Sequence, residues 1–399
     1  QQSPAALASL IFGFYAGGVY LTPIFGGFLA DRVLGRTNTV ALGAILMAIG
    51  HFAMAFEQSF LLALSCLLIG VGCFKGNIAS QVGELYAPED LRRADAFQLY
   101  FLGIQISVVV SPLICGTLGQ KVAWHWGFGA AGVGMLIGLA IYLAGRKYLP
   151  AERPRGAAAA SAPPRPKLTG RDWVTIAVLI VLLPVMALSS IGNQEIFNAY
   201  LLWGDAHYQL EFFGQRMPTA WLVSLDAVVS FVTMVGVVAF WRFYGKWRKE
   251  PDEIVKIAIG SLIASLGPLV LAWAAANEVA TGQKASLLVG LGFHIFNDIG
   301  FAMVFPVGLA LYSRAAPKAF SGLFIGVYYL HLFMCNLATG KLAGMIETMS
   351  GSAFWTMHAG IIAGAGAILL VAAILFRKVL APTEPDPAQA AVEAAPARA

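Results

Sequence analysis

Long apolar runs separated by short polar segments are the feature that most limits how this chain can fold. At about 1.5 Å per residue, each run is long enough to cross a hydrocarbon layer of about 30 Å. The eleven runs cover approximately residues 5–30, 37–56, 59–85, 96–118, 127–148, 173–203, 219–243, 253–276, 285–313, 319–346 and 353–378. With 58% hydrophobic and only 12% charged residues, a water-soluble globule would expose far too much apolar surface. The sequence therefore predicts an all-α protein that crosses a membrane many times.

The basic residues show which loops share a side of the membrane. Most of the 26 Lys and Arg residues lie in every second loop, together with Arg32 and Arg36. The opposite loops hold only Lys121, Arg216 and Lys284. Since cytoplasmic loops are enriched in Lys and Arg, we expect the C-terminus to be cytoplasmic. The net charge of +5 then indicates topology and not binding to nucleic acid.

A charged turn joins the first two apolar runs. Its residues follow the pattern Gly-x-x-x-Asp-Arg-x-x-Gly-Arg, here Gly27, Asp31, Arg32, Gly35 and Arg36. This pattern resembles the cytoplasmic 2–3 loop of major facilitator transporters, where it is tied to the conformational change. We expect small residues here to let two helices approach closely. A generic basic turn after a membrane helix is the simpler alternative.

Five further segments make the resemblance specific to one family of these transporters. They are Tyr20–Pro23, Phe74–Ile78 (Phe-Lys-Gly-Asn-Ile), Ala96–Gln105, Trp221–Asp226 and Pro306–Leu309. Together they resemble the proton-coupled oligopeptide transporter (POT) family. Within these five segments, three positions depart from the family pattern, because Gly76 replaces a Pro, and Gln105 and Asp226 each replace an Asn.

The resemblance implies the major facilitator fold, in which two six-helix bundles enclose a central site. We expect an N-terminal bundle at 1–148, a cytoplasmic linker at 149–170, a C-terminal bundle at 171–380 and a disordered tail at 381–399. Eleven of the twelve expected spans are visible. The family's first helix, with its Glu-x-x-Glu-Arg motif, would precede Gln1.

In the N-terminal half, Lys75 lies near the middle of its span. A lone ammonium at that depth needs a carboxylate or a wet cavity. The resemblance implies that Lys75 binds the substrate carboxylate and takes part in proton coupling, and a structural ion pair is the alternative. It also implies that Tyr20 lines the cavity and that Gln105 bonds the peptide backbone. The alternative that Tyr20 is only a packed aromatic residue stays open.

In the C-terminal half, the family usually has a Glu where this chain has Phe301. Asp298 lies one turn earlier, on the same helix face, so we predict that it binds the peptide amino group or the proton. Asp226 is predicted to help hold that amino group. Tyr328 occupies a site where the family often has Trp, so we include it among the substrate-binding residues. The alternatives are a packing role for Tyr328 and an Asp298 that bonds only to Asn297.

Glu195 lies in the outer third of its span. The resemblance implies an acidic gate residue nearby, so we predict gating or proton coupling for Glu195, against an interfacial carboxylate as the alternative. The histidines within spans, including His294 and His331, are interpreted as core residues more readily than as proton carriers.

These observations favour a proton-coupled symporter that imports di- and tripeptides by alternating access. We expect no enzyme activity, no cofactor beyond the proton gradient, no metal and no nucleic acid partner, because no phosphate loop, metal spacing or nucleophile motif appears. A monomer in the bacterial inner membrane is expected. The alternatives are a facilitator for another cargo, such as nitrate, a peptide-like drug or a dicarboxylate, and a non-transporting peptide sensor.

Overall fold

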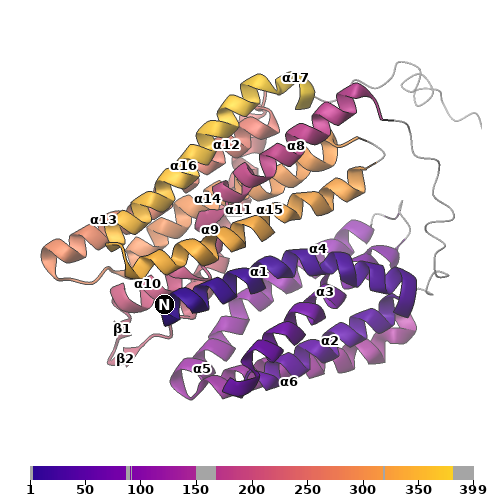
Figure 1. Cartoon of the computed structure of the whole chain (residues 1–399). Coiled ribbons are helices and arrows are strands. Elements are labelled where there is room, and N and C mark those ends of the chain that lie inside the picture. The colour runs from indigo at the N-terminus through magenta and orange to yellow at the C-terminus, as the bar shows by residue number, and fades with distance from the viewer. Residues whose placement is uncertain (1–2, 87–89, 91, 150–167, 318–319, 381–399) are drawn as a thin grey trace, which may run out of the picture.

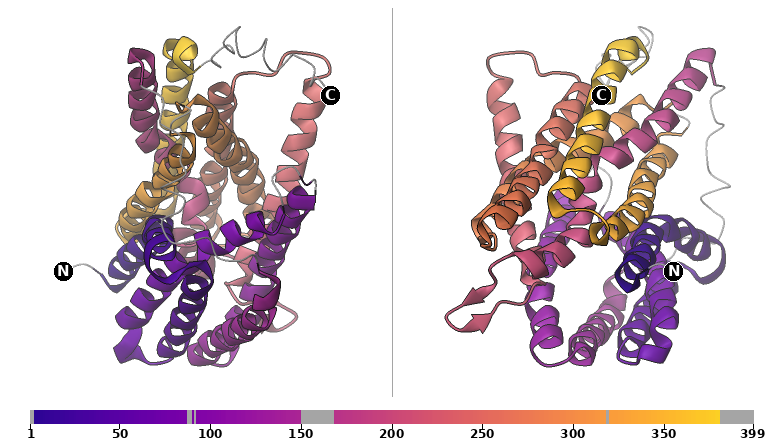
Figure 2. Two further views of the ribbon diagram at one scale, coloured as in Figure 1. Left: turned by 90° about the vertical axis from the view of Figure 1, so that its right-hand side faces the viewer. Right: turned by 60° about the vertical axis from the view of Figure 1, so that its left-hand side comes forward.

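The helices form two groups that follow one another along the chain (Figure 1). The computed structural model describes residues 3–86, 90, 92–149, 168–317 and 320–380. Most of the predicted linker and the whole predicted tail, 381–399, lie outside the described residues. Figure 2 shows the same two groups from two further sides, with a short β-hairpin projecting from the second group.

The first group contains the helices from residue 4 to residue 144. They are α1 (Pro4–Leu29), α2 (Arg36–Ala53), α3 (Phe60–Glu84), α4 (Arg92–Ser111), α5 (Thr117–Lys121) and α6 (Trp124–Ala144). Ser3 begins α1, because its hydroxyl accepts the backbone N–H of Ala6 at 3.2 Å. A wider π-helical turn, Ala30–Leu34, follows α1 and contains Asp31 and Arg32 of the charged turn.

The second group is larger and carries the main buried apolar clusters. Its helices are α8 (Gly170–Ser189), α9 (Ile191–Glu195), α10 (Ala199–His207), α11 (Trp221–Tyr244), α12 (Glu253–Ala264), α13 (Leu266–Thr281), α14 (Leu287–Ala315), α15 (Ser321–Ala343), α16 (Gly351–Leu375) and α17 (Arg377–Leu380). Strands β1 (Glu211–Phe212) and β2 (Gln215–Arg216) pair antiparallel. Gly214 makes the tight turn between them with φ of +74°.

The number of spans differs slightly from the prediction. Ten segments of the described residues have the length and hydropathy of a membrane span, against eleven predicted. The segment that fails is the predicted run 37–56, which forms α2. Its first turn, Arg36–Thr39, and His51 near its end lower its mean hydropathy, although the helix packs closely along α3.

The predicted single span 173–203 is also wrong, because the structure divides it into α8, α9 and α10. The chain leaves helical geometry at Asn198, where φ is −134° and ψ is −101°. The Glu195 carboxylate accepts the N–H of Ala199 at 3.1 Å and so replaces a bond that a continuous helix would have made. Only Gly170–Ser189 has the properties of a span in this region.

The two groups meet mainly through α1 against α15 and α4 against α11. At one end of this junction, a Cβ on Gly13 would lie 2.7 Å from the Cα of Gly340, so the two helix backbones are in direct contact. Where α11 meets the first group, Trp221 Nε1 donates to Thr117 Oγ1 at 2.9 Å. These contacts lie at the ends of the helices that the charge pattern predicts to be outside.

Candidate functional site

Lys75 of α3 lies at the junction of the two helix groups. Its ammonium stands over the ring of Tyr20 on α1, with Nζ 4.7 Å from the ring centroid. Tyr20 in turn stacks on Tyr329 of α15, which belongs to the second group, with 6.4 Å between the ring centroids. Lys75 is exposed and forms no ion pair within the part of the chain that the structure describes. The site thus presents a cation held by an aromatic face.

An aromatic row continues from Tyr329 into α14. The Phe305 ring lies 5.9 Å from the Tyr329 ring, and Phe301 stacks on Phe305 at 5.3 Å. Phe301 is the position at which a glutamate was expected from the resemblance. It is therefore part of an apolar row that leads toward Lys75, and no carboxylate replaces it there.

Asp226 and Asp298 come together inside the second group, with His294 as a third member. His294 Nδ1 lies 2.9 Å from Asp226 Oδ1, and Asn297 donates to Asp298 Oδ1 at 3.1 Å. One ligand atom from each of Asp226, His294 and Asp298 lies within 4.8 Å of the other two. All three side chains are buried, so we name this cluster the triad. The triad has the composition of a cation-binding site, either for a proton or for a metal ion.

Sequence reasoning found the two aspartates but interpreted His294 as a core residue. A signal for His294 was present, because it precedes Asp298 by four residues and so shares its helix face. Asp226 comes from α11, and its approach to α14 cannot be read from spacing within one helix.

Glu195 pairs with a second buried histidine. His358 Nε2 on α16 lies 3.2 Å from Glu195 Oε1, and both side chains are fully buried. The alternative of a carboxylate hydrated at the membrane surface is therefore wrong for this structure. The histidine partner was not anticipated, because 163 residues separate it from Glu195.

Two other predicted residues lie apart from the triad. Tyr328 is completely buried in the second group, and its hydroxyl donates to the Phe305 carbonyl at 2.8 Å. Its neighbour Tyr329 is the aromatic that reaches Tyr20. Gln105 on α4 is half-buried.

Almost the whole chain is similar to known proteins. The sequence profile described as "POT family" matches residues 37–162. The peptide transporter YePEPT of Yersinia enterocolitica is 28% identical over 413 residues, which cover 86% of this chain and 80% of that protein. A di-/tripeptide transporter of Lactococcus lactis is 27% identical over 394 residues, covering 82% and 78%. A crystal structure of a mutant peptide transporter POT with sulfate is 25% identical, with a TM-score of 0.82 over 94% of this chain and 87% of that one.

The chain is similar to proteins of the POT family along almost its whole length. The major facilitator fold predicted from the sequence is thereby confirmed. The relatives are transporters and not enzymes.

The charged turn is held by ion pairs around Arg36. Arg36 bonds to Glu84 at the end of α3, and its guanidinium lies 3.7 Å from Asp31. Gly35 has φ of +80°, a conformation that favours glycine. Arg32 lies over the Phe28 ring at 5.6 Å.

The two glycines before the turn differ. Gly26 is buried against Gly72 and Cys73 of α3, so the expected close helix approach is confirmed there. A Cβ on Gly27 would meet nothing within 4 Å, so Gly27 does not mediate that approach. The role of Gly27 in the conformational motif stays a prediction.

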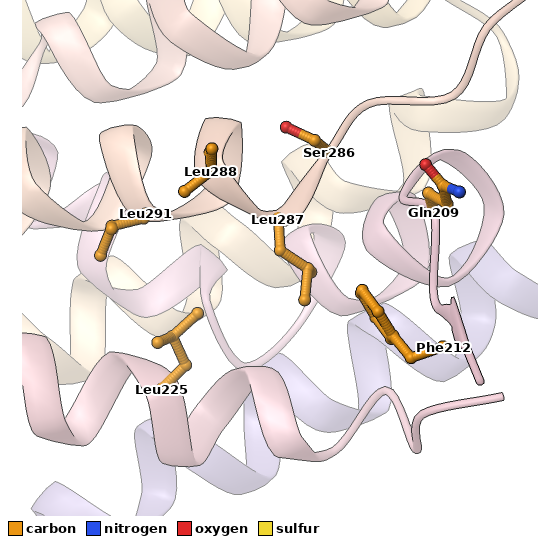
Figure 3. Close-up of a pocket in the computed structure, with 7 residues that line it drawn as sticks. All are labelled: Gln209, Phe212, Leu225, Ser286, Leu287, Leu288 and Leu291. Carbon is orange, nitrogen blue, oxygen red and sulfur yellow. The ribbon is translucent and has the colours of Figure 1, made fainter. Parts of the chain in front are cut away.

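One cavity lies at the outer end of the α11–α14 seam (Figure 3). Its volume is about 370 Å³, and its lining consists of Gln209, Phe212, Leu225, Ser286, Leu287, Leu288 and Leu291. In Figure 3, Leu225 of α11 lies below Leu287 of α14. Because the lining has no charged side chain, this cavity does not match the two charged ends of a free peptide.

Proposed function

We propose that this protein is a proton-coupled symporter that imports di- and tripeptides by alternating access. The observation that carries the proposal is the position of Lys75, whose ammonium lies over Tyr20 where α1 meets α15. A fixed positive charge inside a membrane is costly unless a counter-charge or water accompanies it. A peptide carboxylate supplies that counter-charge, so Lys75 is proposed to hold the C-terminal end of the substrate.

The amino end of the peptide is assigned to Asp226 and Asp298 in the second group. A carboxylate pair binds an ammonium more strongly than the amide of an Asn does. Tyr20 offers both its hydroxyl and its ring to the middle of the substrate, and Gln105 offers an amide to the peptide backbone. Tyr329 is added to the proposed site because it stacks on Tyr20. Tyr328 is proposed only to support this wall, since its hydroxyl bonds to the backbone of α14.

The transport step is proposed to be a rocking of the two groups about this site. The contacts between Gly13 and Gly340, and between Trp221 and Thr117, close the junction at its predicted outer end. The charged turn with Gly27, Asp31, Arg32, Gly35 and Arg36 is proposed to act as the conformational motif. Lys75, Glu195 and Asp298 are proposed to link this motion to the proton.

The apolar helices make this a multi-pass membrane protein. We further propose that it is a monomer in a bacterial inner membrane with a cytoplasmic C-terminus, driven by the proton gradient without a cofactor. The runner-up is a carrier of another cargo, which the departures at Gln105, Asp226 and Phe301 favour. A peptide sensor that does not transport is the third possibility.

The test is uptake of labelled dialanine by liposomes that contain the purified protein. We expect an inward proton gradient to drive accumulation, and unlabelled dipeptides and tripeptides to compete with it. Competition by nitrate or a dicarboxylate, and not by peptides, would indicate the other cargo. Peptide binding without uptake would indicate the sensor. Lys75→Gln is expected to abolish accumulation.

A further inference from the structure

The apolar cavity at the outer end of the α11–α14 seam has no part in the proposed transport. Its volume of about 370 Å³ lies within the range of about 300–1,000 Å³ that is usual for small-molecule sites. In Figure 3, the Leu287 side chain points toward the space between Leu225 and Phe212. Because these three side chains offer only hydrocarbon, the cavity suits an apolar ligand or the apolar part of a larger one.

Exposed apolar side chains continue from this cavity along both helices. On α11, Val232 follows Leu225 by seven residues and is 62% exposed. On α14, Ile295 follows Leu288 by seven residues, and both are exposed. Since seven residues make about two helical turns, each pair shares one face of its helix. The cavity is therefore the outer end of an apolar seam, and such a seam on a multi-pass membrane protein is favourable only against hydrocarbon.

The β-hairpin bounds the cavity and carries a second apolar feature. Phe212 lines the cavity, and Phe213 at the tip of the hairpin is fully exposed. Phe213 has φ of +52°, a backbone conformation that bulky residues rarely adopt. Figure 2 shows this hairpin projecting from the second group. An exposed Phe on a projecting turn is unfavourable in water, but it is stabilised at the boundary between lipid headgroups and acyl chains. The hairpin thus indicates that the cavity opens at headgroup depth.

A polar cavity of about 230 Å³ adjoins the apolar one, and Gln209 lines both. Its lining includes both signs of charge, because Glu211, Arg216 and Lys284 all contribute to it. Arg216 pairs with Asp205 at 2.8 Å. Glu211 and Lys284, in contrast, form no ion pair with any residue that the structure describes. The polar cavity therefore offers one negative and one positive group that a ligand can neutralise.

We propose that the two cavities together bind one zwitterionic phospholipid from the outer leaflet of the membrane. Its phosphate pairs with Lys284 and its ammonium with Glu211, while one acyl chain enters the apolar cavity and follows the seam between α11 and α14. A zwitterionic headgroup matches both charges of the polar cavity, whereas an anionic headgroup leaves Glu211 unpaired and repels it. A free peptide also carries both charges, but it has no long hydrocarbon chain to fill the apolar cavity. This inference does not depend on which cargo is transported.

The test is native mass spectrometry of the purified full chain. The protein is mixed with equal amounts of phosphatidylethanolamine and phosphatidylglycerol that have the same acyl chains. We expect one phosphatidylethanolamine molecule to stay bound, in excess over phosphatidylglycerol by about 2- to 5-fold, the range that ion pairs at an exposed surface give. Equal binding of the two lipids, or an excess of phosphatidylglycerol, would overturn the proposal.

Two kinds of variant separate this site from unspecific coating by lipid. Leu287→Trp fills the apolar cavity and should lose the bound lipid. Its control is Leu269→Trp, because Leu269 on α13 is an exposed leucine, at 43%, that lies outside the cavity lining. The control should keep the lipid, and equal retention by both variants would overturn the proposal.

The headgroup variant is Glu211→Gln, which changes only an exposed charge on the hairpin and leaves the apolar cavity intact. We expect the preference to shift toward phosphatidylglycerol, because Lys284 then faces the phosphate without a neighbouring carboxylate. Lys284→Gln should reduce the retention of both lipids. An unchanged preference in Glu211→Gln would contradict the assignment of the headgroup and overturn the proposal.

Discussion

His358 Nε2 lies 3.2 Å from Glu195 Oε1, and neither side chain has any surface exposed. The same carboxylate accepts the backbone N–H of Ala199 at the start of α10. One buried acid therefore joins α16 to the point at which α9 gives way to α10. This arrangement makes Glu195 a structural residue in this conformation, in addition to its proposed role in gating.

Removing this carboxylate should destabilise the protein. Glu195→Ala leaves Nε2 of His358 without its carboxylate partner and the N–H of Ala199 without an acceptor. We expect a loss of about 3–5 kcal/mol of unfolding free energy. Thermal unfolding of the detergent-solubilised protein would measure the loss. Glu195→Gln retains an oxygen for the same N–H and should lose clearly less, and equal unfolding temperatures for both variants would contradict this explanation.

The Tyr20 ring should matter more than its hydroxyl for the affinity of the site. A cation over an aromatic face is stabilised by about 0.5–2 kcal/mol, which corresponds to roughly 2- to 30-fold in affinity. Tyr20→Leu removes that face and should weaken dipeptide binding by an amount in this range. Tyr20→Phe keeps the face and should weaken binding less. Calorimetric titration with a dipeptide would compare the two, and a larger effect for Tyr20→Phe would show that the hydroxyl dominates.

Two adjacent glycines at the end of α1, Gly26 and Gly27, allow a substitution to be compared with a matched control. A Cβ on Gly26 would clash with the backbone of Gly72 on α3, whereas a Cβ on Gly27 would enter open space. Gly26→Ala should therefore force α1 and α3 apart and lower the unfolding temperature by several degrees, since overpacking costs about 1–3 kcal/mol. Gly27→Ala is the control for the change in helix propensity. Similar unfolding temperatures for both variants would contradict the packing explanation.

Asp205, in the last turn of α10, should make stability depend on pH. Burial alone would raise the pKa of Asp205, but hydrogen bonds from Thr219 and Arg216 outweigh it and hold the pKa below its usual value. A lowered pKa means that the stabilisation is present above the unfolded pKa of about 3.9 and is lost as the pH falls through the folded value.

The corresponding variant is Asp205→Asn. It should unfold at a lower temperature than the wild type at neutral pH. The difference between the two proteins should shrink as the pH falls below about 4, because the wild-type carboxyl then becomes protonated as well. Unfolding temperatures over a pH series would measure this, and a difference that does not change with pH would contradict the assignment.

Much of the architecture follows from hydropathy and local motifs. The end of α1, the charged turn and the start of α2 were predicted, because Gly35 and the charges at 31, 32 and 36 are incompatible with a continuous apolar helix. Lys75 was found for a similar reason, since one charge within a long apolar run is conspicuous. Both features depend on neighbours in the sequence.

The features that were missed depend on partners that are distant in the sequence. The break before α10 requires Glu195, and Glu195 is held by His358, which no local pattern connects to it. The triad likewise requires α11 to approach α14. The hydropathy of a segment shows how apolar it is. It does not show which buried polar groups on different helices will contact one another.

The direct contact between Gly13 and Gly340 has a consequence for how the carrier can be controlled. Neither residue carries charge, so this latch between α1 and α15 is stabilised by close van der Waals contact of two backbones. Changes in salt concentration should therefore leave it almost unaffected. A bulky side chain at either glycine would keep α1 and α15 apart. The carrier would then stay open at its predicted outer end, which is a conformation that this structure does not display.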